Sequence, residues 1–173
     1  MRVKMTVGCP GAGKTTWGRD LEPRTLKLSL DEHRAAIFGL KKLYWDGINE
    51  NPWRRRVLHT TWKSTLRSAI RMGLALEADG QESFDIALLN THLFLRSFEA
   101  DLTIMKDLGV TPELFVFDAP WEELLHRNAI RPAEDSQHPD DLRTYYDAFI
   151  APDAWWRSLP HTVVPVQLLH LQD

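Results

Sequence analysis

The sequence predicts an α/β fold in which helices flank a parallel sheet of four to five strands, on the basis of three observations. Residues 2–20 read as a short strand, a glycine-rich turn and the start of a helix. Two near-continuous apolar runs, 84–90 and 113–119, are typical of strands buried on both faces of a parallel sheet. Polar residues follow predicted strands at their carboxyl ends, which is where open α/β sheets bind ligands.

Residues 8–15 form the most specific short motif of the chain. Their sequence, Gly-Cys-Pro-Gly-Ala-Gly-Lys-Thr, fits the pattern G-x-x-x-x-G-K-[ST] of a phosphate-binding loop and predicts a P-loop NTPase fold. Glycines let backbone N–H groups converge on a polyphosphate, and the helix that follows adds the positive end of its dipole. The alternative is a glycine-rich strand-to-helix turn without a ligand, and the strand-loop-helix context favours the phosphate site.

The loop also predicts which residues hold the nucleotide. Lys14 is expected to reach the β- and γ-phosphates as a catalytic residue, and the Thr15 hydroxyl to ligate Mg²⁺. The expected cofactors are Mg²⁺ and a nucleoside triphosphate, ATP or GTP, as phosphate donor. From this loop the nucleotide-binding residues are Gly8, Cys9, Pro10, Gly11, Ala12, Gly13, Lys14, Thr15 and Thr16.

Length and composition set the broad class of the protein. A chain of 173 residues fits one kinase domain over residues 1–173, and 43% hydrophobic with 26% charged residues is ordinary for a soluble globular protein. The single cysteine, Cys9, makes no internal disulfide and suits a reducing compartment. No signal-peptide or membrane-spanning run is found, so we expect a cytoplasmic protein with no membrane partner. The net charge of −3 means that nucleic-acid binding must rest on a local basic patch.

The next elements bring a carboxylate towards the loop. Residues 15–21 read as a helix, and the alternating run 25–30 as a strand that delivers Asp31 at its carboxyl end. Asp31 could accept the proton of an attacking hydroxyl, and Arg34, one turn on, could hold an acceptor phosphate. Equally, Asp31 could cap the helix and Arg34 pair with it.

A long amphipathic helix is predicted over residues 52–78, after a polar connection at 40–52. Its apolar stripe is Val57, Leu58, Trp62, Leu66, Ile70 and Leu74. Positions 59, 63, 67 and 71 carry His, Lys, Arg and Arg at steps of four, which makes a continuous basic stripe beside Arg54, Arg55 and Arg56. Such a stripe is either a solvated surface or a surface that follows a phosphodiester backbone.

The carboxyl-terminal half supplies further polar candidates. Asn90 and Thr91 follow the strand 84–90 and could position Mg²⁺ through water, touch the acceptor, or cap the helix expected at 95–108. Beyond the strand 113–119, a helix places Arg127 and Arg131 on one face, and a polar hinge follows at 133–138. Two arginines beside a hinge are what a lid needs in order to close over a transferring phosphoryl group. A surface helix end is the alternative for these arginines. A helix near 142–150 and a final strand at 163–169, interrupted by Pro165 and hence at an edge, complete the chain.

Five segments together resemble the 5′-polynucleotide kinase family, the kinase half of phage polynucleotide kinase-phosphatase. They are GCPGAGKTTW at 8–17, SLDEHR at 29–34, NTHL at 90–93, FDAPWEELLHRNAIR at 117–131 and DDLRTYY at 140–146. The segments keep the family's order and span nearly the whole chain, and the tryptophan after the loop and the FDAPW block are more specific than the loop alone. The family's aspartate at the end of the third strand is Asn90 here, and its following asparagine is His92.

The resemblance implies a kinase that moves the γ-phosphate of a nucleoside triphosphate to the 5′-hydroxyl end of DNA or RNA, in nucleic acid repair. It implies that Asp31 is the general base, that Arg34 holds the 3′-phosphate of the acceptor, and that Arg131 is the lid arginine on the donor phosphates. The acceptor-binding set is Asp31, Arg34, Asn90 and Thr91, while Arg127 and Arg131 join the nucleotide-binding set. No D-x-D-x-[TV] motif occurs, so no 3′-phosphatase activity is expected.

Two other functions stay open at this stage. One is a P-loop kinase of a small molecule, such as a nucleoside, nucleotide or antibiotic hydroxyl. The feature that distinguishes it from the polynucleotide kinase is whether the 54–71 helix borders the acceptor pocket. The other is a nucleotide-binding switch without transfer, which would not need Asp31 as a base. The sequence leaves the oligomeric state open, and a homo-oligomer is compatible with it.

Overall fold

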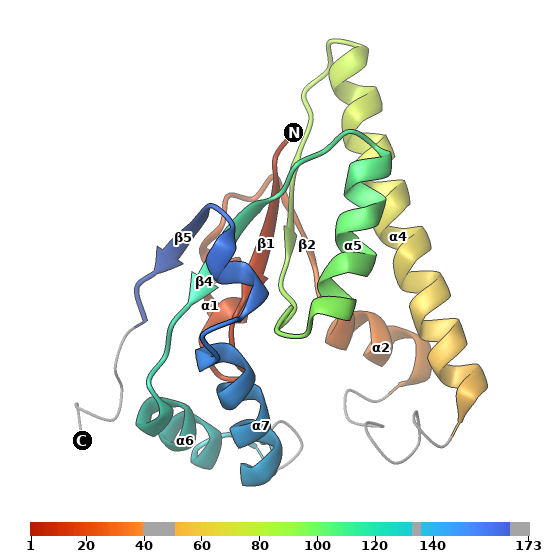
Figure 1. Ribbon diagram of the computed structural model, residues 1–173. Coiled ribbons are helices and arrows are strands. Elements are labelled where there is room, and N and C mark those ends of the chain that lie inside the picture. The colour runs from red at the N-terminus through yellow and green to blue at the C-terminus, as the bar shows by residue number, and fades with distance from the viewer. Residues whose placement is uncertain (40–50, 133–135, 167–173) are drawn as a thin grey trace.

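The sheet has five parallel strands in the order β2-β3-β1-β4-β5 in this computed structural model (Figure 1). The structure describes residues 1–39, 51–132 and 136–166. The strands are β1 (Val3–Val7), β2 (Thr25–Leu28), β3 (Asp85–Leu88), β4 (Glu113–Phe117) and β5 (His161–Val164). The helices are α1 (Lys14–Asp20), α2 (Leu30–Phe38), α4 (Pro52–Ala78), α5 (Leu95–Asp107), α6 (Trp121–Ala129), α7 (Pro139–Ile150) and the 3₁₀ helix η1 (Trp155–Ser158). The predicted α/β class and strand number are confirmed.

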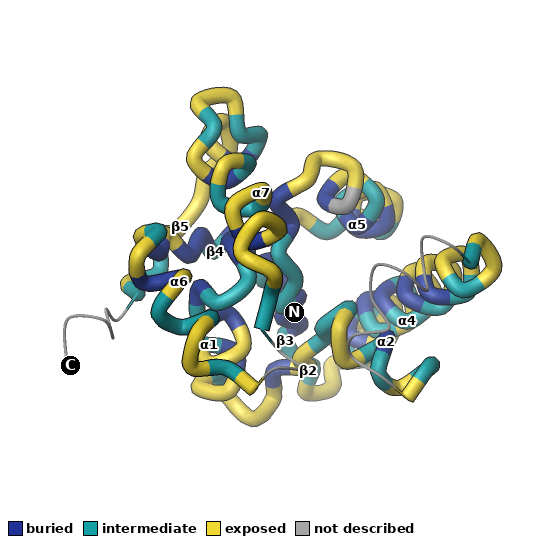
Figure 2. The backbone as a smooth tube through the Cα atoms, turned by 90° about the horizontal axis from the view of Figure 1, so that it is seen from below, coloured by how far each residue is buried: buried dark blue, intermediate teal, exposed yellow. Residues whose placement is uncertain are grey.

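The strand order contains one reversal, and it lies beside β1. The connection from β1 to β2 runs one way along the sheet, whereas the three later connections run the other way. Because parallel crossovers are almost always right-handed, this reversal puts α1 on one face and α4, α5 and α7 on the other. The loops after β1 and β3 therefore diverge at the carboxyl ends of the strands, which leaves the ligand-binding crevice of an open α/β sheet between them. Figure 2 shows α1, α2, α6 and α7 around this end of the sheet.

The main core lies between the sheet and the two longest helices. Val3 and Met5 of β1 pair in register with Ile86 and Leu88 of β3, and all four side chains are fully buried. Three residues of the predicted α4 stripe, Trp62, Leu66 and Ile70, are buried in the same cluster, Leu58 is buried as well, and Val57 and Leu74 are half-buried. The 3.6-residue periodicity of residues 52–78 thus identified both the helix and its buried face.

The opposite face of the sheet is covered only in part. The seven-residue helix α1 packs Trp17 against Phe115 and Phe117 of β4, with ring centroids 4.9 and 5.6 Å apart. The amino half of this face is polar, because Asp85 pairs there with Lys4 and with Arg2. Although burial favours the neutral acid, hydrogen bonds from these two residues lower the pKa of Asp85 to about 2. The expectation that residues 84–90 are buried on both faces therefore fails at Asp85, since α1 is too short to reach it.

A buried polar chain links β1 to α5 and α4 beneath the carboxyl end of β3. His92 has a left-handed φ of +45° and is 2% exposed. Its Nδ1 lies 2.9 Å from the Thr6 carbonyl oxygen and its Nε2 lies 3.1 Å from Asp101 Oδ2. Trp62 Nε1 donates to Asp101 Oδ1 at 2.9 Å. Asp101 therefore provides hydrogen-bond partners for two buried side chains, His92 and Trp62. This buried hydrogen-bond network fixes the turn that follows β3.

Several element boundaries differ from the sequence expectations. The strand expected at 25–30 ends at Leu28, so Asp31 lies in the first turn of α2 and not on a strand end. The last strand is His161–Val164, at the sheet edge as Pro165 indicated, and residues 167–169 lie outside the described residues. The expected connection at 40–50 and the hinge residues 133–135 also lie outside them. No helix of the described segments is long and apolar enough to cross a bilayer.

Removing the carboxylate of the buried polar chain should destabilise the fold. We expect Asp101→Ala to lower the free energy of unfolding by about 2–4 kcal/mol, because two buried nitrogens lose their partner. Asp101→Asn keeps one acceptor and should cost less. Urea unfolding measures both variants, and Glu99→Ala on the exposed face of α5 is the matched control. Equal stabilities of Asp101→Ala and the control would contradict the prediction.

Candidate active site

The loop between β1 and α1 has the tight backbone that its glycines predict. Gly11 and Gly13 have φ of +91° and +102°, which residues with a Cβ rarely adopt. A Cβ at Gly8 would lie 2.9 Å from Phe117 Cβ and 3.0 Å from the Phe117 carbonyl oxygen, so glycine is needed beside β4. Cys9 is 2% exposed, and burial raises the pKa of its thiol to about 12, so it packs as a small apolar residue. The loop therefore turns from β1 directly into the start of α1, as a phosphate cradle requires.

Lys14, the first residue of α1, is folded back over this loop. It is 7% exposed, and its Nζ donates to the carbonyl oxygens of Gly8 at 2.8 Å and Cys9 at 2.7 Å. Burial lowers the pKa of Lys14 to about 8, and Asp31 opposes this shift while Arg131 adds to it. Asp31 and Arg131 thus lie near enough to the lysine to act on its charge. Three residues that are far apart in the sequence meet at the loop.

Asp31 and Arg34 form an ion pair in the first turns of α2. Arg34 Nη1 donates to Asp31 Oδ1 at 2.9 Å, and Arg34 is buried whereas the Asp31 side chain is 65% exposed. The pairing foreseen as the structural alternative is therefore present. The helix cap foreseen with it is not, because the amide of Leu30 bonds to another residue, Asn90. Asp31 is exposed next to the loop, held in orientation by a buried guanidinium.

Asn90 and Thr91 tie three elements together. Asn90 Oδ1 accepts from the Leu30 amide at 2.7 Å, which caps α2 from the end of β3. The Thr91 carbonyl oxygen accepts from the Gly8 amide at 3.1 Å. Neither residue caps α5, whose N-cap position is Phe94 without a side-chain bond, so that alternative is wrong. The polar turn after β3 positions both the phosphate loop and the helix that carries Asp31.

The two predicted lid arginines lie over the loop from α6 and the residues after it. Arg127 Nη1 donates to the Gly11 carbonyl oxygen at 3.1 Å. The Arg131 guanidinium carbon is 3.9 Å from where a Cβ on Gly11 would stand. Arg127 Nε also bonds the carboxylate of Glu123, a fully buried residue one turn earlier. Both cations therefore stand at the cradle, on the side opposite α2.

Sequence reasoning missed two residues of this site. Glu123 holds Arg127, and the signal was present in the sequence, since an acid four residues before an arginine on a helix is a common pair. The other is Tyr145 of α7: burial and then Asp31 and Asp141 raise its pKa while Arg34 lowers it, so it lies within electrostatic range of the Asp31–Arg34 pair. No local pattern indicates Tyr145, because α7 reaches the site only through the tertiary fold.

The arrangement can bind a polyphosphate and supply a proton acceptor beside it. Thr15 and Thr16 are exposed at the amino end of α1. No cluster of three acidic, histidine or cysteine side chains occurs among the described residues. The donor set fits Mg²⁺ bound through one hydroxyl with phosphate oxygens and waters as its other ligands, which is how this ion often binds. Thr15 would hold it.

Comparison with known proteins gives the family and the fold. A family model described as an AAA domain matches residues 3–148. A chain of the Pnkp1/Rnl/Hen1 RNA repair complex is 18% identical with a TM-score of 0.67, and the match covers 96% of this chain and 49% of that one. The present chain thus spans about half the length of that relative.

Two further solved structures match over most of both chains. Shikimate kinase from Acinetobacter baumannii, solved with shikimate, is 18% identical with a TM-score of 0.58, covering 96% of this chain and 84% of that one. The tunicamycin resistance protein of Deinococcus radiodurans is 13% identical with a TM-score of 0.58, covering 99% and 91%. At these identities the similarity establishes the fold, and the predicted P-loop NTPase fold is confirmed.

Binding of a polyphosphate should take up a proton at alkaline pH. In the empty site the pKa of Lys14 is about 8, and a bound polyphosphate favours the ammonium, so the complex holds more protons than the free protein above pH 8. Affinity for a non-hydrolysable ATP analogue should fall about 8-fold between pH 7.5 and 9. Calorimetry in two buffers of different ionisation enthalpy measures the uptake, and Lys14→Arg, which stays charged, should lose it. Binding without proton uptake at pH 9 would contradict the assignment.

Proposed function

The chain belongs to the AAA-domain family whose model matches residues 3–148, and from this premise we propose that it is a P-loop kinase of polynucleotide 5′ ends. The reaction moves the γ-phosphoryl group of ATP or GTP to the 5′-hydroxyl of DNA or RNA, as a step in the repair of nucleic acid ends. The fold does not select this acceptor, because matching structures include a shikimate kinase as well as a chain of an RNA repair complex. The choice rests on the charges beside Asp31.

The observation that supports a polynucleotide is a series of cations from α2 to α4. Burial and then the cations Arg55, Lys63 and Arg34 lower the pKa of His59, against the raising effect of Asp101. The helices themselves are in contact, since His33 Nε2 of α2 lies 2.9 Å from Thr61 Oγ1 of α4, so the buried arginine beside Asp31 lies within electrostatic range of the basic stripe. This proximity supports a polynucleotide acceptor over a small molecule.

The stripe continues along the surface of α4, where a shallow hollow lies between side chains of this one helix. A hollow of about 330 Å³ is lined by Lys63, Arg67 and Arg71 together with three hydroxyl residues, Thr60, Ser64 and Ser68. Cations four residues apart on a helix stand about 6 Å from each other along its axis. A row of phosphates on a single strand uses such a series, whereas one small acceptor uses a single cation. The chain as a whole carries a net charge of −3, so the basic surface is local.

Transfer then uses the residues gathered at the loop. Asp31 takes the proton of the 5′-hydroxyl as the new bond forms from that oxygen to the γ-phosphorus and the bond to the β,γ-bridging oxygen breaks. Arg34 orients the carboxylate and faces the phosphate next to the acceptor nucleoside. Lys14, Arg127 and Arg131 offset the charge of the transferring group. Thr15 would hold Mg²⁺, which when bound would supply further charge neutralisation at the phosphate oxygens.

Loss of the Asp31 carboxylate should abolish transfer and spare nucleotide binding. We expect Asp31→Asn to lower kcat by about 100-fold or more, because general-base catalysis typically contributes that much. The Kd for the nucleotide should change less than about 2-fold, since the loop amides and Lys14 remain. Glu32→Gln, the next residue of α2, is the matched control. Transfer of labelled γ-phosphate to a 5′-hydroxyl oligonucleotide measures kcat, and undiminished turnover would remove Asp31 from this role.

The basic stripe should matter for long acceptors only. We expect the double variant Lys63→Gln/Arg67→Gln to raise KM for an oligonucleotide. The dependence of log affinity on log salt concentration should also become less steep, by about 0.7 in slope for each phosphate that the variant no longer neutralises. KM for a nucleoside 3′-phosphate should stay unchanged. Arg19→Gln/Arg24→Gln, exposed cations remote from the carboxyl ends of the strands, is the control. Equal effects on both acceptors would favour the small-molecule kinase.

A further inference from the structure

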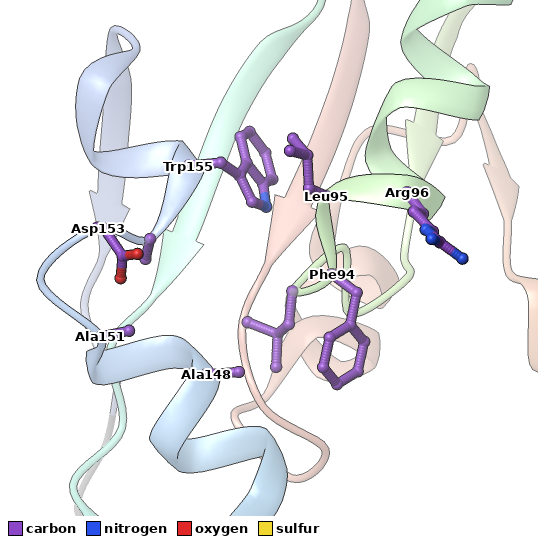
Figure 3. A pocket seen from close by; sticks show the side chains of 9 residues that line it. Phe94, Leu95, Arg96, Ala148, Ala151, Asp153 and Trp155 are labelled. Atoms are coloured by element: carbon purple, nitrogen blue, oxygen red, sulfur yellow. The ribbon is translucent and has the colours of Figure 1, made fainter.

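Beside the site lies a hollow that the transfer reaction described above does not use. It has a volume of about 550 Å³ and is bounded by the start of α5 on one side and by the end of α7 and η1 on the other. Figure 3 shows Trp155 and Leu95 along one rim, with Phe94 and Ala148 below them. This volume is in the range of pockets that bind small molecules, and the lining is mostly apolar.

One wall of the hollow is rigid and aromatic. Trp155 Nε1 donates to the His92 carbonyl oxygen at 3.1 Å, and its ring stacks on Phe98 of α5 with centroids 3.5 Å apart. The indole is therefore held by a hydrogen bond and a ring contact before any ligand arrives. A preformed wall loses little conformational entropy on binding a flat partner.

The other side of the hollow is formed by large apolar residues that are unusually exposed to solvent. Phe94 is 46% exposed and Leu95 is 49% exposed, next to each other at the start of α5. Neighbouring large side chains left in water mark a binding surface more often than single ones do. Polar groups stand at the rims, with the Asp153 carboxylate on one side and the Arg96 guanidinium directed away on the other (Figure 3).

Phe94 joins the hollow to Tyr145 of α7. The Phe94 ring lies 5.6 Å from the ring of Tyr145, centroid to centroid. Burial and then the Asp31 and Asp141 carboxylates raise the pKa of Tyr145 while Arg34 lowers it, so the phenol lies within electrostatic range of the Asp31–Arg34 pair. An acceptor whose hydroxyl faces Asp31 would meet Tyr145 and then the Phe94 wall.

We propose that this hollow receives a nucleobase of the acceptor strand, within its first two nucleotides, against the Phe94 and Trp155 walls. The proposal rests on the polynucleotide function above and gives the acceptor strand a second point of recognition. A nucleobase suits the lining because it has flat apolar faces and polar edges, and aromatic walls with a carboxylate at the rim match both. With the base in the hollow, the backbone crosses the start of α5 beside Arg96, on the way to the cations of α4.

Because the walls of the hollow are apolar and aromatic, the site should tolerate any base in the acceptor sequence. Apolar and aromatic walls bind the face that every base has, and stacking on one aromatic side chain is commonly worth about 1–3 kcal/mol, or roughly 5- to 150-fold in affinity. The site should accept all four bases with small differences in KM. Removing the base at this position, rather than changing it, is the informative perturbation.

Oligonucleotides with 2-aminopurine at position one, two or five test the site by fluorescence, independently of turnover. Stacking quenches this base, so binding to the full protein should quench it at position one or two and leave position five unchanged. Phe94→Ala should relieve the quenching. Ala148→Met fills the hollow while both aromatic walls stay in place and should relieve it too, and Val163→Ala, exposed on the edge strand β5, is the control.

Kinetics with an abasic acceptor complete the test. The wild-type protein should phosphorylate an oligonucleotide that lacks the base at the quenched position with about 10-fold lower kcat/KM. In Phe94→Ala and Ala148→Met this penalty should shrink below about 2-fold. Oligonucleotide phosphorylation with no quenching and no abasic penalty would overturn the hollow as a base site and leave the kinase intact. Failure to phosphorylate any oligonucleotide, with turnover of a small acceptor, would instead overturn the proposed function.

Discussion

The site depends on one backbone hydrogen bond, from the Gly8 amide to the Thr91 carbonyl oxygen, 3.1 Å long. It joins the loop after β1 to the turn after β3 at the point where the strand order reverses. Backbone groups buried there must find partners, and this pairing lets the two segments satisfy each other. Through Asn90 the same turn caps α2, and through His92 it is fixed to α5. The phosphate cradle and the carboxylate beside it are therefore parts of one connected structure.

Positive charge is concentrated at this junction, an arrangement that suits an anion. Lys14 is buried with two carbonyl oxygens as partners, and two arginines stand over the same loop. Burial penalises the ammonium, which is why the pKa of Lys14 falls towards neutrality in the empty site. A polyphosphate reverses that penalty and offsets the repulsion among the cations. The exposed carboxylate of Asp31 is left for the acceptor side.

The direction of the crossovers decides what borders the acceptor. Three connections that run in the same direction along the sheet put α4, α5 and α7 on one face of it, and α2 packs against α4 through His33, which contacts Thr61 and Trp62. The basic stripe of α4, the apolar start of α5 and Tyr145 of α7 thus surround one side of the crevice. The other side has α6 and its arginines. The proposed donor and acceptor surfaces would then be separated by the reversal in strand order, which is a property of the topology and not of any one residue.

The sequence by itself determined the helices, the strands, the phosphate loop and the buried stripe of α4, because local periodicity and glycine geometry depend on near neighbours along the chain. It also predicted that Asp31 lies on the same side of the sheet as the phosphate loop, since parallel strands end at a common edge, and its functional role stays a prediction. Only the tertiary structure decided that Asn90 caps α2, that Asp85 faces a polar half-sheet, and that Phe94 and Trp155 enclose a hollow. These are contacts between residues tens of positions apart, and they follow from crossover direction and helix length, which no local pattern records.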